Sequence, residues 1–344
     1  MRVCYKFDLE PLTHFLTGAV LARAGFNRKT ALATATMTLA AEAPDLDVVS
    51  LIKGPVYGFA HHRGFTHSFL GLILTSALVV GFVYLIWRVR GRKTNIPGLP
   101  PRWGLLFLFA YIAGLSHILL DFTNNYGVRP FWPFWEKWYS WDIVSIIEPA
   151  LYIFLLSGLV LPELFSRGEP LPHGRSAALL ALIGIGSLYA IRDHEHRHAV
   201  HELKTMHFNF SAPARVSAFP YMWSVSRWYA VAETNEFFAS SDIDVRSGKL
   251  DMTELRFFYK KPETPATLVA KRSYAGRVYL DWAQYPWITE SISGEDAVVR
   301  FKDLRYDYAR MRGGSALSCT IEIDRNLNVV GEKFGARKQN PPID

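Results

Sequence analysis

Residues 61–87 read HHRGFTHSFLGLILTSALVVGFVYLIW. From residue 68 onward this stretch carries no charge over 20 residues, and a helix of that length can cross a hydrocarbon core of about 30 Å. Three histidines, His61, His62 and His67, stand directly before the apolar run. The stretch therefore predicts a membrane-spanning helix with imidazole groups at its N-terminal end. A histidine in that position is an interfacial side chain, a helix cap or a metal ligand.

Three further apolar segments follow, over residues 103–120, 143–161 and 176–191, and the last is the shortest. His117 lies in the first of them and Glu148 in the second. Two helices rich in Ala, Leu and Thr are expected before the spans, over 13–25 and 28–43. They are too short to span well, so we expect them to be half-inserted or packed against the other helices. The pattern predicts an α-helical multi-pass membrane domain over residues 1–192.

The positions of the basic residues predict the orientation of these spans. The loop 88–102 is the densest basic loop of the apolar part, and the positive-inside rule places it in the cytoplasm. Residues 44–67, 122–142 and everything after about residue 192 then lie on the outer face. The net charge is +7, and most of the excess accompanies the apolar part. That distribution suits loops beside an anionic leaflet and argues against a nucleic-acid partner. The first residues, MRVCYKFDLEPLTHF, lack the pattern of a cleaved signal peptide, so insertion is expected to use the internal spans.

The sequence pattern changes after residue 212. Short β-branched or aromatic runs alternate there with Gly, Pro or Asp/Asn clusters, which predicts strands of an antiparallel sheet. We expect a β-rich (α+β) soluble domain over 212–344, joined to the membrane domain by a juxtamembrane linker over 193–211. Only two cysteines occur, Cys4 and Cys319, which excludes a disulfide framework and a thiolate zinc site. The predicted strand runs are RVSAFPYMWSV (215–225), ELRFFYKK (254–261), RVYLDWAQYPWI (277–288), AVVRFKDLRYDYA (297–309) and SCTIEIDRNLNVV (318–330).

Residues able to bind a metal are grouped in the apolar part. In the predicted topology each lies at or near the outer end of its helix, whereas a random set would be divided between the two faces. Mixed histidine and carboxylate ligation suits zinc or another divalent first-row ion such as manganese. About eight ligands are too many for one tetrahedral ion, so two or three ions are expected. The candidate ligands are His14, Asp45, His62, His67, His117, Asp121, Asp142 and Glu148.

Individual spacings support this grouping. His117 and Asp121 are four residues apart and therefore share one helix face. Pro44 is expected to end the second short helix and to present Asp45 and Asp47 in an extended turn. These relations favour a common site.

Two further features suggest a shared site with a catalytic role. Gly64 is expected to allow a bend that brings His62 and His67 together. Glu148 lies inside a predicted span, where an ionisable side chain is costly unless it is paired, metal-bound or in a water-filled cavity. In catalysis, Asp47 or Glu148 would act as general base, and Arg63 would neutralise a phosphate oxygen.

Each residue also has a structural interpretation. His14 is as consistent with an ordinary helix residue as with a ligand, and His61 suits a surface position or one behind the ligands. Asp47 can serve as a helix cap or salt-bridge partner. His117 and Asp121 can form a buried hydrogen-bonded pair. The prediction rests on the group as a whole.

The same segments resemble the YdjM-like family of membrane-bound metal-dependent hydrolases, described as inner-membrane proteins induced with the SOS response. The resemblance covers about residues 8–165. It implies an inner (cytoplasmic) membrane location and metal-site roles for His14, Asp45, His62, His67, His117 and Asp121, with Asp142 and Glu148 as further candidates. The matching segments are THFLTG (13–18), APDLD (43–47), HHRGFTHS (61–68), SHILLD (116–121) and the WD…EP stretch at 141–149.

The order of these ligands is also distantly similar to the zinc-dependent phospholipase C and single-strand nuclease superfamily. That superfamily is all-helical and carries a three-zinc cluster, so the similarity implies phosphoester hydrolysis. Its members use the N-terminal amine of the mature chain as a ligand, whereas thirteen residues precede His14 here.

A second motif offers a rival interpretation. Residues 193–204 read DHEHRHAVHELK and contain a literal H-E-x-x-H pattern formed by His194, Glu195 and His198. The two intervening residues, His196 and Arg197, are polar, whereas a protease zinc helix packs against its fold. A polar linker is therefore favoured over adventitious metal binding, and both over a metalloprotease.

Together these features predict a membrane hydrolase that cleaves a phosphoester in a phospholipid or lipid-linked substrate on the outer face. The competing hypothesis is a non-enzymatic membrane protein with a structural metal site and a C-terminal binding domain. A catalytic metal site keeps an open position, whereas a structural one is closed. Neither the role nor a protein partner of the C-terminal domain is indicated by the sequence.

Overall fold

The computed structural model describes residues 11–94, 98–165, 174–308, 317–335 and 337–339, and they form two compact units. The helical unit contains the described residues of Phe7–Val48 and His62–Asp193. The β-rich unit combines Val49–His61 with the residues from His194 onward. The expectation of a helical N-terminal part and a β-rich C-terminal part is confirmed. The short segment 49–61 nevertheless belongs with the β-rich unit, which the sequence did not indicate.

Among the described residues, three helices are long and apolar enough to cross a membrane: α4 (Phe69–Val89), α5 (Trp103–Thr123) and α7 (Gly174–Thr205). The predicted span 143–161 begins as a helix only at Pro149, because the backbone N–H groups of Ile143 and Val144 donate to the Thr123 carbonyl instead. The resulting helix α6 (Pro149–Phe165) is shorter than the other three. The remaining helical elements of this unit are α1 (Pro11–Arg23), η1 (Phe26–Arg28), α2 (Ala33–Glu42) and η3 (Phe65–His67). The 3₁₀ helix η2 (Ala43–Lys53) belongs to this unit only as far as Val48.

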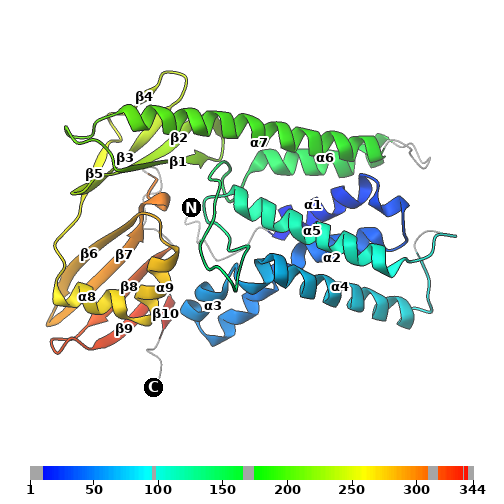
Figure 1. Ribbon diagram of the computed structural model, residues 1–344, viewed down its shortest axis with the longest axis horizontal. Helices are drawn as coiled ribbons and strands as arrows, with labels where there is room; N and C mark the ends of the chain where they lie inside the picture. The colour runs from blue at the N-terminus through cyan, green and yellow to red at the C-terminus, as the bar shows by residue number, and fades with distance from the viewer. Residues whose placement is uncertain (1–10, 95–97, 166–173, 309–316, 336, 340–344) are drawn as a thin grey trace. The chain divides into compact units, whose positions relative to one another are not determined.

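Helix α4 has one apolar face exposed and the other packed against α5 (Figure 1). A Cβ at Gly114 of α5 would lie 2.7 Å from Leu72 Cδ2, so glycine lets the two helices approach closely. The exposed apolar face suits lipid rather than water. Its side chains recur about every four residues and are 45–63% exposed: Leu70, Leu74, Leu78, Phe82 and Leu85.

Helices α1 and α2 each bury one face in this bundle, while Leu12, Phe15 and Leu39 on them remain exposed. Val20, Ala22 and Met37 are fully buried. Gly18 allows the close approach, because a Cβ there would lie 2.6 Å from the Met37 carbonyl oxygen. This agrees with the expected packing of two short helices against the others.

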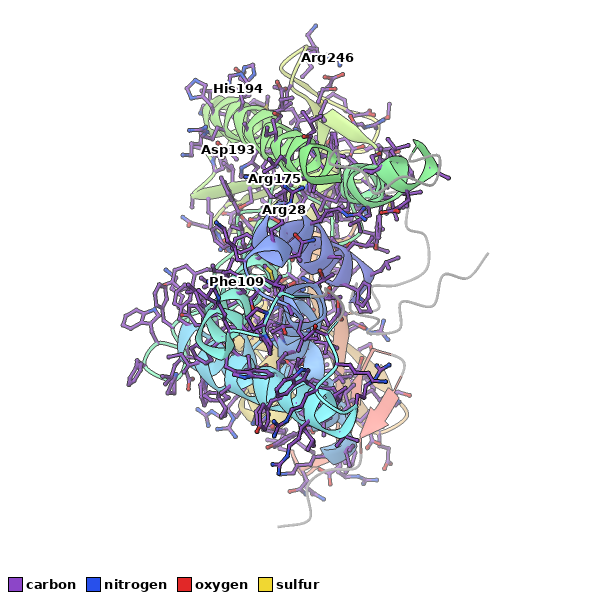
Figure 2. All side chains as sticks on the ribbon, turned by 90° about the vertical axis from the view of Figure 1, so that its right-hand side faces the viewer. Arg28, Phe109, Arg175, Asp193, His194 and Arg246 are labelled. Atoms are coloured by element: carbon purple, nitrogen blue, oxygen red, sulfur yellow. The ribbon has the colours of Figure 1, made fainter. Side chains whose placement is uncertain are left out.

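Arginines gather at one end of the helical unit. Arg23 at the end of α1 donates to the Leu159 carbonyl oxygen over 2.6 Å, and Arg175 at the start of α7 donates to the Ala24 carbonyl over 3.0 Å. Figure 2 views this end, with Arg28 and Arg175 labelled. Helix α4 ends and α5 begins here, flanked by Arg88 and Arg102. The start of α4 and the end of α5 therefore lie at the opposite end of the hairpin.

The β-rich unit contains two antiparallel five-stranded sheets (Figure 1). The first sheet has the order β1-β2-β3-β4, with β5 also paired to β3. The end of α7 packs on it through Ala199 and Leu203. The second sheet has the order β10-β9-β8-β7-β6. The strands are β1 (Arg215–Tyr221), β2 (Ser224–Glu233), β3 (Phe237–Asp244), β4 (Lys249–Leu250), β5 (Arg256–Tyr259), β6 (Pro286–Ser293), β7 (Asp296–Asp303), β8 (Ser318–Ile323), β9 (Val329–Phe334) and β10 (Arg337–Gln339).

Three helices complete this unit: α3 (Pro55–His61), α8 (Pro265–Arg272) and α9 (Tyr274–Trp282). Phe59 of α3 lies 5.1 Å from the Trp282 ring and 4.3 Å from the Phe334 ring, centroid to centroid. These aromatic contacts explain why the segment 49–61 joins the β-rich unit. A 3₁₀ turn, η4 (Leu304–Tyr306), follows β7.

One local expectation was wrong. RVYLDW was predicted as a strand but forms most of α9, because Ser273 caps the helix and Ala275, Tyr279 and Trp282 bury one helical face. Residues 193–205, part of the expected juxtamembrane linker over 193–211, continue α7 as a helix. Cys319 is buried in β8, and Cys4 lies outside the described residues.

Candidate metal centre

The metal-binding candidates of the sequence converge where several helices begin or end. Asp45 lies in the first turn of η2, directly after α2. His67 ends η3, and Ser68 then caps α4 by accepting a hydrogen bond from the Gly71 N–H. His117 and Asp121 lie one turn apart near the end of α5.

The bend before His67 lies at Arg63 and Gly64. Arg63 has φ 52°, in the left-handed region, whereas Gly64 has φ −93°. A left-handed conformation is unfavourable for a residue with a side chain. Here it is held in place because the Arg63 backbone N–H donates to Asp47 Oδ2 over 2.8 Å.

Four side chains form a buried group that can hold a metal ion: Asp45, His67, His117 and Asp121. One ligand atom from each lies within 4.8 Å of the other three. The Nε2 atoms of His67 and His117 are 3.0 Å apart. Asp45 Oδ1 lies 3.3 Å and 3.4 Å from these nitrogens, and Asp121 Oδ2 lies 3.3 Å from each.

These separations fit one metal ion. A tetrahedral ion with bonds of about 2.0–2.1 Å to nitrogen and oxygen has ligand–ligand edges of roughly 3.3–3.4 Å. Adjacent positions of a six-coordinate ion with bonds of about 2.1 Å are roughly 3.0 Å apart. Moreover, both oxygens of Asp45 and Oδ2 of Asp121 are buried yet accept no hydrogen bond from the described part of the chain. Buried carboxylate oxygens without hydrogen bonds are costly, and a cation between them would remove that cost.

The far sides of both imidazole rings are fixed by hydrogen-bond acceptors. His117 Nδ1 lies 2.6 Å from the Ala41 carbonyl oxygen, so this nitrogen donates and Nε2 keeps its lone pair in the neutral ring. His67 Nδ1 lies 3.2 Å from Asp47 Oδ2. Such contacts behind a ligating histidine fix its tautomer and raise its basicity. Asp47 therefore lies behind a ligand instead of in the group of four.

Arg63 fixes the second carboxylate. Its Nη2 lies 2.6 Å from Asp121 Oδ1, while Nη1 donates to the Gly127 carbonyl over 3.0 Å. The guanidinium also lies over the Tyr126 ring, 4.7 Å from its centroid. Because Oδ1 is occupied by Arg63, Oδ2 is the Asp121 oxygen directed at the two histidines.

His14 and Glu42 lie next to the group. The His14 ring stacks on that of His117 at 3.7 Å, and its Nε2 lies 3.6 Å from Asp121 Oδ1. Burial and the neighbouring His117 lower the pKa of His14 to about 3, so its ring is neutral. Burial and the Asp45 charge raise the pKa of Glu42 to about 7. Glu42 was not predicted from the sequence, where it looks like an ordinary carboxylate at the end of a helix.

Electrostatics within the group favour a bound cation. Burial raises the pKa of Asp45, but the imidazoles of His117 and His67 outweigh it and hold that pKa well below its usual range. Burial lowers the pKa of His67, but Asp121, Asp45 and Asp47 outweigh it and hold that pKa well above 6.5. In the absence of a metal, a proton on imidazole thus supplies positive charge between the carboxylates.

The structure does not bring the remaining candidates into the group. Glu148 forms a buried ion pair with Arg192 of α7 over 2.8 Å, and the guanidinium neutralises the Glu148 carboxylate. Asp142 lies between α5 and α6 and is not one of the four. His62 Nδ1 lies 3.1 Å from Asp47 Oδ1, one step further out. His61 is exposed and contacts the Tyr57 carbonyl oxygen at 2.9 Å.

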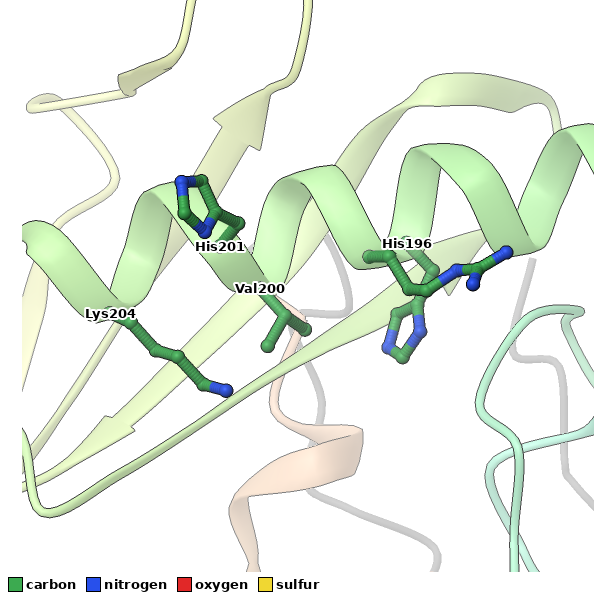
Figure 3. Close-up of a pocket in the computed structure, with 5 residues that line it drawn as sticks. His196, Val200, His201 and Lys204 are labelled. Atoms are coloured by element: carbon green, nitrogen blue, oxygen red, sulfur yellow. The ribbon is translucent and has the colours of Figure 1, made fainter.

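The H-E-x-x-H segment lies on the last turns of α7 within the β-rich unit. His194 and His198 are exposed, and His198 Nε2 lies 3.4 Å from Glu202 Oε1. A cavity of about 270 Å³ on this helix is lined by His196, Arg197, Val200, His201 and Lys204 (Figure 3). It contains no carboxylate, so it lacks the acidic ligand that the metal group has.

Comparison with known proteins identifies one relative and one family. A protein of Bacillus subtilis (strain 168) named "Uncharacterized protein YfhP" is 24% identical over 312 residues, which cover 89% of this chain and 86% of that protein. No solved structure matches. The family described as "YdjM inner membrane protein" matches residues 9–198, more than half of the chain and the part that carries all four side chains of the candidate metal group. The chain therefore belongs to the YdjM inner membrane protein family.

Proposed function

We propose that this protein is a membrane-embedded metal-dependent hydrolase that cleaves a phosphoester in a phospholipid or lipid-linked substrate. The observation that carries the proposal is the convergence of Asp45, His67, His117 and Asp121 in a buried group beside the ends of two candidate spans. Two buried carboxylates and two oriented imidazoles are a donor set for a divalent ion such as zinc or manganese.

One ion is expected, not the two or three suggested by the sequence, because the four convergent atoms make a single site. When bound there, a divalent ion supplies Lewis-acid chemistry and acidifies a water molecule. The chain's own contribution is orientation: the Ala41 carbonyl and Asp47 hold the two rings, and Arg63 holds Asp121. Arg63 is therefore assigned to positioning, because its guanidinium is already engaged.

We assign the general base to Glu42. Its Oε1 is buried without a hydrogen-bond partner among the described residues, so this carboxylate beside Asp45 has an oxygen available to take up a proton. Asp47 already accepts from Arg63 N–H and contacts two histidines. Glu148 is neutralised by Arg192. Neither has the same freedom to take up a proton.

The position of the site along the spans supports a lipid substrate. His67 directly precedes α4, and His117 and Asp121 lie near the end of α5, opposite the arginine-rich end of this hairpin. With the arginine-rich end in the cytoplasm, the site and the segment after α7 face outward. A lipid phosphate group reaches such a depth without leaving the bilayer.

The test uses wild-type protein loaded with zinc or manganese in lipid nanodiscs, with release of phosphate or head group as the readout. Asp45→Asn should lose both the metal and turnover. Glu42→Gln should keep the metal and lower turnover by about 10²–10⁴-fold, the usual contribution of a general base. Glu136→Gln, at an exposed carboxylate, is the matched control and should change neither. Cleavage of soluble phosphoesters without any lipid product would contradict the lipid assignment.

One observation favours the competing structural role for the metal. The four ligands come entirely from the protein and are at most 7% exposed, as in closed structural sites. In that case Glu42→Gln would leave every measured property unchanged, while Asp45→Asn would lower the unfolding temperature of the helical unit. The pair of variants therefore separates the two functions.

A further inference from the structure

An aromatic turn follows α5 at the metal-centre end of the helical unit. Phe131, Phe134 and Trp135 are 48%, 83% and 58% exposed. Backbone hydrogen bonds nevertheless order the turn: the N–H groups of Phe134 and Trp135 donate to the Phe131 carbonyl over 3.1 Å and 3.2 Å. The turn is closed below by Val128 and Tyr139, which exchange two hydrogen bonds of 2.9 Å. Exposed aromatic rings on an ordered turn indicate a surface that meets an apolar partner.

The aromatic turn is attached to the residues around the metal group. The Phe69 N–H at the start of α4 donates to the Pro130 carbonyl over 2.9 Å. The Phe69 ring lies 5.5 Å from that of Phe131, centroid to centroid. Arg129 Nη2 lies 3.3 Å from the His62 carbonyl oxygen. These contacts hold the aromatic turn against the segment that carries His67.

The chemistry of the turn identifies its partner. Its apolar rings continue the exposed apolar face of α4, which begins with Phe69 and Leu70 at 39% and 45% exposure. Phe and Trp flanked by cations are typical of the boundary between acyl chains and head groups. Arg129 stacks on Trp138 at 4.4 Å, and Lys137 lies 5.7 Å from the Tyr139 ring centroid. This combination fits a bilayer interface better than the polar surface of a soluble protein.

We propose that Phe131, Phe134 and Trp135 insert into the head-group region of the membrane that α4 crosses, and that this anchor holds the metal centre at that plane. The anchor concerns membrane depth and does not depend on catalysis. Within the proposed function, it also determines which part of a lipid reaches the site: the phosphate-bearing head group and not the acyl chains.

The test measures the depth of single labelled positions in the full-length protein reconstituted into phosphatidylcholine/phosphatidylglycerol vesicles. Cys4→Ser and Cys319→Ala remove the native thiols, and Phe134→Cys carries a bimane fluorophore. Leu78→Cys, at an exposed position in the middle of α4, calibrates the bilayer interior. Glu295→Cys, in the turn between β6 and β7, is the polar control. Lipids with a nitroxide at acyl carbon 5 or 12 report shallow or deep contact.

The account predicts that the label at 134 is quenched at least twice as strongly by the shallow nitroxide as by the deep one. The label at 78 should show the reverse order, and that at 295 little quenching by either. Absence of lipid quenching at 134, or a profile like that at 78, would overturn the proposal. Energy transfer between labelled copies without lipid quenching would assign the surface to a second copy instead. Because no turnover is measured, the result is independent of the hydrolase proposal.

Discussion

Two sets of buried charges in the helical unit look alike in the sequence but differ in the structure. The metal group has two carboxylates, Asp45 and Asp121, with imidazoles between them and carboxylate oxygens that accept no hydrogen bond from the described residues. Glu148, by contrast, faces Arg192 over 2.8 Å, and both are 2% exposed. An ionisable residue in an apolar segment is therefore not enough to indicate function. The distinction is which carboxylate oxygens remain without a hydrogen bond: Arg63 binds only Oδ1 of Asp121, which leaves Asp121 Oδ2 and both oxygens of Asp45 directed at the group.

The largest effect on stability is expected at the neutralised pair. Arg192→Met leaves Glu148 buried without its partner and should lower the free energy of unfolding by about 3–5 kcal/mol. Metal content per folded chain should stay unchanged, because neither residue contacts the metal group. Chemical denaturation in detergent measures the first quantity and elemental analysis the second.

The double variant Arg192→Met with Glu148→Leu serves as control and should regain most of the lost stability, because no unpaired charge remains. Loss of metal in Arg192→Met would show that the two sets of charges are coupled and would contradict their independence.

A smaller effect is expected behind the ligands. Asp47→Asn keeps the shape of the side chain but weakens its contact with His67 Nδ1, now 3.2 Å from Asp47 Oδ2. Removing such a contact typically lowers metal affinity by about 10–100-fold. Competition with a chromogenic chelator measures the affinity. Asp244→Asn, at an exposed carboxylate at the end of β3, is the control, and equal affinities for the two variants would contradict the orienting role of Asp47.

Protons and the metal ion should compete for the metal group, so metal affinity should depend on pH. Burial lowers the pKa of His67, but its carboxylate neighbours outweigh it and hold that pKa well above 6.5, so the metal-free site keeps a proton that the metal must displace. Metal affinity should therefore rise with pH, by up to about tenfold per unit for one proton. Calorimetry in buffers of different ionisation enthalpy should show proton release at pH 7. Absence of proton release would mean that His67 is neutral before binding.

The smallest effect is expected at His61. It adjoins His62 in the sequence, but its ring is exposed and contacts the Tyr57 carbonyl at 2.9 Å. His61→Ala should leave metal affinity unchanged within error, as the chelator assay would show. A tenfold loss would require His61 to reach the metal group.

The grouping of the four candidate side chains was predictable from the sequence because each lies in a short motif near an element end: APDLD, FTHS and HILLD. Helical spacing alone related His117 to Asp121. The pairing of Glu148 with Arg192 was not predictable, since it joins residues 44 positions apart on elements whose packing no local pattern reveals. The predicted helix start at Ile143 failed for a related reason: its N–H donates to the Thr123 carbonyl, a contact made by tertiary folding.

Glu42 illustrates a different limit. In the sequence it looks like an ordinary helix-end carboxylate within AAEAP, and only burial beside Asp45 gives it a raised pKa. Arg63 illustrates another, because its flanking histidines suggested a substrate contact, whereas the guanidinium binds Asp121. Residue type and position along the chain were sufficient to predict that these four side chains belong to one group. They were not sufficient to predict which neighbours orient them.

The most direct test of the metal centre is elemental analysis of the purified protein, loaded with zinc or manganese and then desalted. Wild type is compared with His67→Ala and His117→Ala, and His62→Ala is the neighbouring control. The account predicts one ion per chain in wild type and in His62→Ala, and none in the other two variants while they remain folded. No bound metal in folded wild type, or equal content in all four proteins, would contradict the assignment of Asp45, His67, His117 and Asp121 as a metal site.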